Sequence, residues 1–191
     1  RDQKERQAGF VLGHCAFGRV PAMDFYDVIR ARRSVRSYQS TPVPQSAVEH
    51  IAEAVNLAPT ACNRQPFRVL FVTDPAKRAA LCDSNRFAWL ADAPAIAVVV
   101  GNSAAAWKRL EGDSIVDVDC AIIMEHLILA ATAEGLGTCW ICAFQRDIAN
   151  AALNLPEGES AVAMTPVGYA ADGFKPVPLT RKPLAQVFEV I

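Results

Sequence analysis

One apolar segment, residues 114–134, constrains the fold more than any other part of the sequence. Its isoleucine, valine, leucine and methionine side chains fall on nearly every face of a helix, and a helix that is apolar all round is buried on all sides. The glycines at 135 and 137 end this helix, because glycine is favoured where the chain must turn left-handed. The chain has 191 residues, enough for one domain or for one protomer of an intimate dimer. The segment therefore predicts a central helix at a dimer interface.

The composition excludes several classes of protein. Hydrophobic residues make up 52% of the chain and charged residues 20%, which argues against disorder. Lys and Arg total 19 against 20 Asp and Glu, so no bulk charge draws the chain to nucleic acid or to an anionic membrane. The six cysteines are scattered, and several lie in apolar runs. That pattern indicates reduced, buried thiols in a cytoplasmic protein rather than a disulfide framework.

Residues 1–22 are charged at first and then briefly apolar. The apolar run is too short for a membrane span and too interrupted for the core of a signal peptide. We therefore expect a flexible leader, or a remnant of upstream sequence, followed by a single domain over residues 23–191.

Hydrophobic periodicity and proline positions predict an α+β domain. The first helix is expected to begin at Asp24 and to end at the arginines that follow; further helices are expected over residues 44–58, 74–82, 86–91 and 146–153. Strands are expected in β-prone apolar runs at residues 67–73, 95–100, 138–142 and 161–167, with Pro166 near an edge or a bend. An extended arm is expected over residues 172–183, and a strand or docked tail over residues 184–191. These elements make a sheet of about four or five strands enclosed by helices.

The sequence Arg32-Arg33-Ser34-Val35-Arg36, here called the arginine segment, places three guanidinium groups and a hydroxyl within five residues. A guanidinium offers a planar fork of donors that matches the oxygens of a phosphate. The segment is therefore a candidate anchor for the phosphate end of a cofactor. The alternative is a solvated basic surface at a helix end. A glycine-rich dinucleotide fingerprint follows a strand and opens a helix, whereas the glycines at 135 and 137 follow a helix. The arginine segment therefore remains the candidate anchor for a phosphate.

Three further groups of polar residues each have a structural and a functional interpretation. The 59–66 loop, bounded by prolines and rich in amides and hydroxyls, is either a surface connector or a turn whose amides read the edge of a flat heterocycle. Cys139 and Cys142 have C-x-x-C spacing but lie in a predicted apolar strand, which favours packed thiols over a redox or zinc site. Glu125 and His126 are interpreted as a buried polar pair or an interface contact rather than as catalytic groups.

Three motifs follow one another with characteristic spacing: Arg-Arg-Ser-x-Arg after a first helix, Pro-Thr-Ala-x-Asn-x-Gln-Pro-Phe at residues 59–67, and Gly-Leu-Gly-Thr-Cys-Trp-Ile at residues 135–141. Together they resemble the nitroreductase family of FMN-dependent oxidoreductases, over residues 23–191. The resemblance implies a mixed, mainly antiparallel sheet of four to five strands enclosed by helices. It also implies an intertwined homodimer with FMN sites at the interface, in which the C-terminal arm embraces the partner.

The resemblance implies a role for particular residues. The FMN phosphate and ribityl chain would be met by the arginine segment, through Arg32, Arg33, Ser34 and Arg36, with Arg36 also near the pyrimidine edge of the ring. The 59–66 loop of the partner subunit would contact the flavin through Pro59, Thr60, Asn63 and Gln65. Arg181 and Lys182 would add a second positive contact to the phosphate.

A further stretch would run along the isoalloxazine ring: Trp140, Ile141, Cys142 and Ala143. A backbone N–H near Cys142 would point at flavin N5. Some family members carry a Glu-Gly pair where this chain has Cys142-Ala143. No catalytic side chain and no metal are assigned, because the cofactor carries the chemistry.

The resemblance implies an NADH- or NADPH-dependent enzyme with ping-pong hydride transfer through flavin N5 to a nitroaromatic, quinone or enone. One alternative is a flavin-binding or flavin-buffering protein without significant turnover. Another is a specialised relative that uses FMN for dehalogenation or flavin breakdown, against which the short segment between Val100 and Ser114 argues. The expected partners are a second copy of the chain and a small-molecule acceptor, with no nucleic acid and no membrane.

Overall fold

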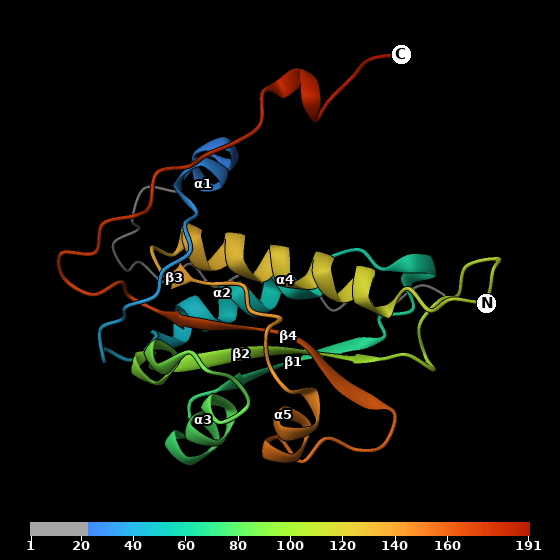
Figure 1. The fold of residues 1–191 in the computed structure, drawn as a ribbon, viewed down its shortest axis with the longest axis horizontal. Coiled ribbons are helices and arrows are strands. Elements are labelled where there is room, and N and C mark those ends of the chain that lie inside the picture. Colours follow the sequence, from blue (N-terminus) through green and yellow to red (C-terminus); the bar gives the residue numbers. More distant parts are fainter. Residues whose placement is uncertain (1–22) are drawn as a thin grey trace, which may run out of the picture.

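A computed structural model describes residues 23–191, so the expected leader lies outside the described residues (Figure 1). One antiparallel sheet organises the chain, with the strand order β1-β2-β4-β3. Its strands are β1 (Phe67–Val72), β2 (Ala95–Asn102), β3 (Gly137–Thr138) and β4 (Glu159–Gly168). The α-helices are α1 (Phe25–Ala31), α2 (Gln45–Asn56), α3 (Pro75–Cys82), α4 (Val116–Ala133) and α5 (Arg146–Ala152). The predicted α+β class is confirmed, and the four strands fall within the predicted four to five. The pairs between the named strands are antiparallel, and Ser34 adds one isolated parallel bridge to Thr138 outside them.

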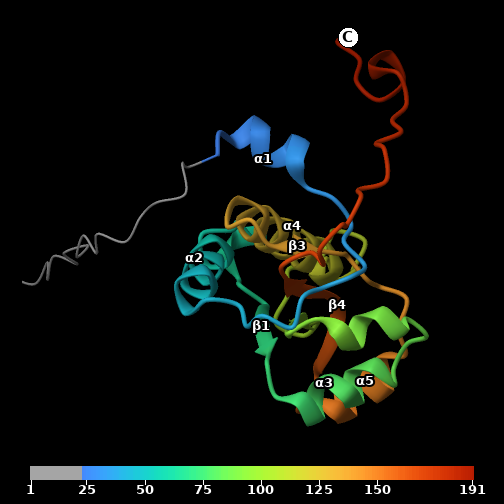
Figure 2. The ribbon, with the colours of Figure 1, turned by 90° about the vertical axis from the view of Figure 1, so that its left-hand side faces the viewer.

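The sheet lies between two helical layers, α2 and α4 on one face and α3 and α5 on the other (Figures 1 and 2). Side chains alternate between the faces of a strand. In β2, Ala95 and Val99 therefore join the cluster under α2 and α4, while Ile96 and Val98 join the cluster on the other face. This burial on both faces explains why β2 is apolar without interruption.

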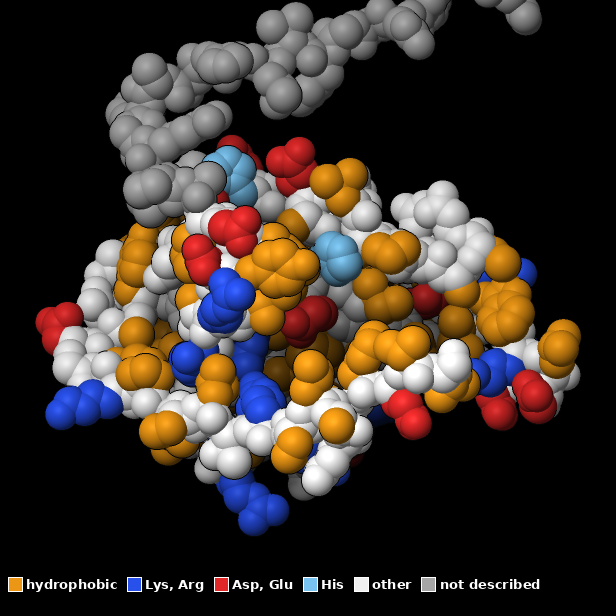
Figure 3. All heavy atoms as spheres, turned by 90° about the horizontal axis from the view of Figure 1, so that it is seen from above, with side chains coloured by type: hydrophobic (Ala, Val, Ile, Leu, Met, Phe, Trp, Pro, Cys, Tyr) orange, Lys and Arg blue, Asp and Glu red, His pale blue; other side chains and the backbone are white. Residues whose placement is uncertain are grey.

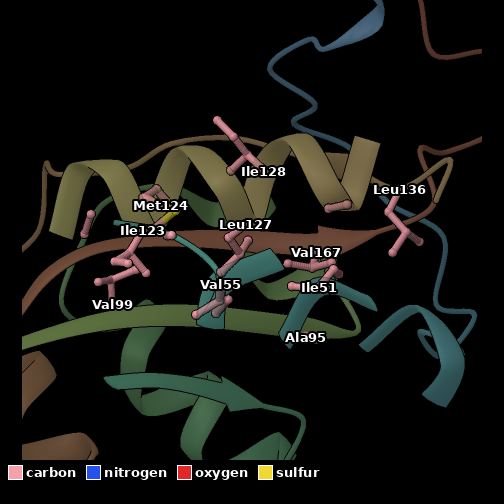
Figure 4. Packing of buried hydrophobic residues seen from close by; sticks show 14 of the residues in the cluster. Ile51, Val55, Ala95, Val99, Ile123, Met124, Leu127, Ile128, Leu136 and Val167 are labelled. Carbon is pink, nitrogen blue, oxygen red and sulfur yellow. The ribbon is translucent and has the colours of Figure 1, made fainter. Parts of the chain in front are cut away.

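The α2 and α4 layer supplies most of the core. Ile51 and Val55 of α2 meet Ile123 and Leu127 of α4 above β2 (Figure 4). The prediction that α4 is buried on all sides is wrong for the single chain, because Val118 is 46% exposed. Glu125 is also exposed, so Glu125 and His126 do not form the predicted buried pair. The interface contact stays a prediction.

The start signals of the short helices α1 and α3 act as the sequence predicts. The Asp24 carboxylate accepts the Tyr26 N–H at 2.9 Å and caps α1. The Asp74 carboxylate accepts the Lys77 N–H at 2.8 Å, and Pro75 opens α3. The helical piece expected over residues 86–91 is a 3₁₀ turn, η2 (Ala88–Asp92).

The continuous strand predicted over residues 138–142 is wrong in extent. Strand β3 ends at Thr138, and pairing with β4 resumes only at Ile141, opposite Met164. The same register places Cys139 opposite Pro166, which has no N–H to donate. The Cys139 N–H instead donates to Thr165 Oγ1 at 3.0 Å. Pro166 is thus the reason that β3 is short. The predicted edge or bend at Pro166 is wrong, because β4 lies between β2 and β3 and its register shift is opposite Val99 and Val100.

The C-terminal segment leaves the body of the molecule past α1 (Figures 1 and 2). Residues 174–183 are irregular and almost entirely exposed, as expected for the arm. The strand expected over residues 184–191 is wrong, since this segment holds only a 3₁₀ turn, η3 (Leu184–Gln186). The alternative, a docked tail, is not seen within the single chain, where the segment is exposed throughout. None of the helices among residues 23–191 combines the length and apolar character needed to cross a bilayer.

Candidate functional site

The arginine segment is joined to the edge of the sheet. Helix α1 ends at Ala31, with Arg32 as its C-cap, and the chain then runs extended beside β3, where the Val35 N–H donates to the Thr138 carbonyl at 2.8 Å. The approach requires a glycine at 137, because a Cβ there would lie 2.7 Å from Val35 Cγ2. Two of the three recognised motifs therefore lie side by side in the structure.

The arginines of the segment have different surroundings. The Arg33 guanidinium donates to the carbonyls of Arg30 and Arg32, the latter at 2.8 Å, and so caps the end of α1. Arg32 is half-buried and Arg36 is exposed, and neither forms a salt bridge within residues 23–191. Two guanidinium groups without a carboxylate partner, together with the Ser34 hydroxyl, form a donor set that fits a phosphate. Figure 3 shows basic side chains between apolar ones on the α1 side of the molecule.

Tyr38 and Cys139 lie beneath this segment. The Tyr38 hydroxyl donates to the Val35 carbonyl at 2.6 Å, and burial raises the Tyr38 pKa. Burial also raises the pKa of the Cys139 thiol, against the opposing influence of Arg36, Ser34 and Arg32. Cys139 is therefore a protonated, packed thiol, as predicted.

Cys142 differs from Cys139, since it is exposed, and the prediction of two buried thiols is wrong at this position. The Trp140 indole N–H donates to Cys142 Sγ at 3.1 Å. Ile141 is buried and paired with Met164, whereas Trp140 and Ala143 face outward. Among the described residues the Cys142 backbone N–H has no hydrogen-bond partner, which leaves it available to a ligand.

The 59–66 loop is a tight turn at the start of α4, with its short 3₁₀ turn η1 (Ala61–Asn63). Three non-glycine residues have a left-handed backbone, with φ of 50° at Cys62, 51° at Asn63 and 50° at Gln65. The Gln65 N–H donates to Thr60 Oγ1 at 3.0 Å, and the Gln65 amide donates to Asn63 Oδ1 at 3.1 Å. Pro59, Asn63 and Gln65 are exposed and Thr60 is half-buried.

The two parts of the predicted site lie at opposite ends of α4. The loop contacts Asp119 in the first turn of the helix, whereas the arginine segment pairs with β3, which follows the last turn (Figure 1). With a rise of 1.5 Å per residue, Asp119 and Ala133 are about 20 Å apart along the axis. One chain therefore does not bring the loop to the arginine segment.

Arg181 and Lys182 are exposed on the arm, and the Arg181 guanidinium donates to the Thr180 carbonyl at 2.9 Å. Neither residue forms a salt bridge within residues 23–191. A cavity of about 190 Å³ lies beside the 59–66 loop, lined by Gln65, Arg68 and Glu159 among others. The arginine segment does not line this cavity.

Two residues near the site were not predicted from the sequence, Tyr38 and Asp119. Asp119 is 1% exposed, and its Oδ1 accepts the Ala61 N–H at 3.0 Å. A carboxylate placed in the most apolar helix of a chain is the signal that points to such a residue, because charged groups are rarely buried without a partner.

The chain is similar to known proteins in sequence and in fold. A model of the nitroreductase family matches residues 29–86 and 82–169. An NADH dehydrogenase of Thermus thermophilus is 28% identical over an alignment of 199 positions, gaps included, which covers 88% of this chain and 96% of that protein. The crystal structure of a nitroreductase family protein of Clostridium difficile 630 superposes with a TM-score of 0.80 and 28% identity, over 87% of this chain and 98% of the other. An FMN-dependent nitroreductase of Clostridium difficile R20291 shares the fold, with a TM-score of 0.74, 21% identity, and coverage of 85% and 96%.

Proposed function

The chain belongs to the nitroreductase family, and on that premise we propose that it is an FMN-dependent NAD(P)H oxidoreductase. Bound FMN would supply the redox chemistry, by carrying a hydride from NADH or NADPH to a nitroaromatic, quinone or enone acceptor. The observation that carries the proposal is the Val35–Thr138 hydrogen bond, which sets the arginine segment beside Thr138, two residues before the stretch 140–143. One relative is named an NADH dehydrogenase, and one protein of the same fold is named an FMN-dependent nitroreductase. These names support NADH as the electron donor and FMN as the cofactor.

The phosphate end of the cofactor is assigned to the arginine segment. Arg32 and Arg36 are free of carboxylate partners within residues 23–191, and Ser34 adds a hydroxyl donor. Arg33 supports this end indirectly, since its guanidinium caps α1 and so shapes the segment. Arg181 and Lys182 are on an exposed arm and would reach a phosphate only through its placement on the body or on a partner.

The ring end is assigned to the stretch Trp140, Ile141, Cys142 and Ala143. Pairing of Ile141 with Met164 fixes the backbone of this stretch against the sheet. The unpaired Cys142 N–H would then donate to the flavin ring, and a donor fixed in place needs no reorganisation when charge develops there. Our assignment uses the backbone, so the Cys142 thiol is not required for it.

The 59–66 loop is assigned to the ring of the partner's site. About 20 Å of helix separates the loop from the arginine segment of its own chain. A second copy would place Pro59, Thr60, Asn63 and Gln65 of one chain against the flavin held by the other. The exposed apolar side chains of α1, α4 and the C-terminal segment 184–191 support a homodimer: Phe25, Tyr26, Ile29, Val118, Val187 and Phe188.

A cytoplasmic location is part of the proposal. The described residues contain five free cysteines and no disulfide, which suits a reducing compartment.

The purified protein tests this proposal directly. It should be yellow, should contain about one FMN per chain by absorbance, and should bleach when NADH or NADPH is added without oxygen. A colourless protein that takes up no FMN from solution would refute the assignment. Bound FMN that neither nicotinamide reduces would instead indicate a flavin-binding protein without turnover.

A further inference from the structure

Asp119 is the one buried carboxylate among residues 23–191. It lies in the first turn of α4, where the positive end of the helix dipole favours a negative charge. Its Oδ1 accepts the Ala61 N–H at 3.0 Å, while its Oδ2 has no hydrogen-bond partner in the described part of the chain. Burial of a charge with one oxygen unpaired is unfavourable. The fold alone, which an apolar residue at 119 would serve, does not explain this carboxylate.

The Ala61 N–H belongs to the strained part of the 59–66 loop. Cys62, Asn63 and Gln65 have left-handed backbone conformations, which non-glycine residues keep only when their surroundings hold them there. The hydrogen bonds from Gln65 to Thr60 and Asn63 lie within the loop, so they shape it without fixing its place.

Few contacts join this loop to the rest of the chain. At its second half the Arg64 guanidinium donates to the Ala106 carbonyl at 3.3 Å, and the Asn102 N–H donates to the Pro66 carbonyl at 2.8 Å. In its first half, the loop is joined to a side chain of the rest of the chain by the hydrogen bond from the Ala61 N–H to the Asp119 carboxylate. An N–H bonded to a carboxylate is stronger than a neutral hydrogen bond. Asp119 is therefore the firmest attachment of the loop at the point where the left-handed turn begins.

We propose that Asp119 is a positioning residue, whose carboxylate holds Ala61 and thereby fixes the turn that aims Asn63 and Gln65 at the flavin ring. This inference rests on the proposed function, which assigns the loop to FMN. Asp119 does not touch the cofactor, and its effect passes through the loop backbone.

Four variants separate this role from a general role in folding. Asp119→Ala removes the acceptor, and Asp119→Asn keeps an oxygen acceptor at the same place. Ala61→Pro removes the donor and is compatible with the backbone, since Thr60 is extended (φ −133°, ψ 158°) and a proline suits the first position of a helical turn. Asp117→Asn is the matched control, because Asp117 is an exposed carboxylate in the same helical turn.

Two measurements are made on each variant: the FMN dissociation constant by fluorescence quenching, and hydrogen exchange of residues 60–65 in the FMN-free protein. We expect Asp119→Ala to weaken FMN binding about tenfold or more and to speed exchange in the loop. Asp119→Asn and Asp117→Asn should bind FMN within about threefold of wild type. The double variant of Asp119→Ala with Ala61→Pro should bind no more weakly than the weaker single variant, because both changes remove one contact.

Additive losses in the double variant would overturn the proposal, and so would unchanged loop exchange in Asp119→Ala. Faster exchange with unchanged FMN affinity would also overturn it, since the loop would then be held without effect on the flavin. If Asp119→Ala does not fold, Ala61→Pro decides the question by deleting the donor alone. If the wild-type protein binds no FMN, the proposed function fails, and the exchange rates still decide whether Asp119 holds the loop.

Discussion

Val35 donates its backbone N–H to the carbonyl of Thr138 at 2.8 Å, and this contact brings a segment from the start of the chain to the edge of the sheet. The Val35 side chain is buried against Gly137, where an added Cβ would lie 2.7 Å from Cγ2 and 2.9 Å from Cβ of Val35. The position of the arginine segment therefore depends on the absence of a side chain at 137.

We expect Gly137→Ala to destabilise the protein by about 1–3 kcal/mol, because the new methyl group overpacks this contact. Urea unfolding followed by circular dichroism measures the change. Val35→Ala in the same chain removes the clashing methyl groups, so the double variant should lose less than the sum of the two single changes. Strict additivity would mean that the two residues do not press on each other.

Arg32→Ala and Arg36→Ala should each weaken FMN binding by about 1.5–3 kcal/mol, the usual size of a lost hydrogen bond to a charged group. Titration of FMN with the purified variants gives the affinities. Arg86→Ala, an exposed arginine outside the assigned site, serves as the control and should leave affinity unchanged. Wild-type affinity in both variants would show that the phosphate is held elsewhere.

Arg33→Ala should behave differently from its neighbours. The Arg33 guanidinium donates to the Arg30 and Arg32 carbonyls, and loss of such contacts costs about 0.5–1.5 kcal/mol of stability. The loss should be visible as faster hydrogen exchange in α1, with a change in FMN affinity smaller than that of Arg32→Ala. An affinity loss as large as that of Arg32→Ala, with α1 unchanged, would place Arg33 on the phosphate.

Stability should fall at high pH through the Cys120 thiol. Burial, with the carboxylates of Asp117 and Asp119 nearby, raises its pKa from 9.0 to about 12. Below pH 9 the thiol is protonated in both states; between pH 9 and 12 only the unfolded chain ionises, so the free energy of unfolding decreases there. The slope of wild type should exceed that of Cys120→Ala by at most about 1.4 kcal/mol per pH unit. Equal slopes in wild type and Cys120→Ala would contradict this assignment.

Features that depend on neighbours in the sequence could be predicted, and features that depend on distant partners could not. The caps at Asp24 and Asp74 and the doubly buried strand β2 follow from local patterns. The end of β3 at Thr138 follows from Pro166 standing opposite Cys139, a pairing that no local pattern contains. The contact between Asp119 and Ala61 joins residues 58 positions apart.

The site itself shows the same division. The motifs indicated which residues belong together, and the Val35–Thr138 contact places two of the three motifs side by side. The remaining motif is the 59–66 loop. Its sequence did not reveal that it lies at the opposite end of α4 from the arginine segment, because helix packing decides where the loop is held. The left-handed conformations of Cys62, Asn63 and Gln65 were equally hidden, since none of the three is a glycine.

The separation of the loop from the arginine segment predicts that each FMN site needs two chains. A protein with Arg32→Ala and Arg36→Ala and a protein with Asn63→Ala should each bind FMN weakly. When they are unfolded together and refolded, random pairing makes about half of the dimers mixed. Each mixed dimer has one site with both defects and one intact site, so about a quarter of the wild-type sites should reappear.

Mixing Arg32→Ala with Arg36→Ala is the matched control, because both defects lie in one segment and every mixed site keeps one of them. In both mixtures the measurement is FMN bound per chain at a low FMN concentration. Recovery of FMN binding in the control would contradict a site shared between chains, and so would a lack of recovery in the first mixture.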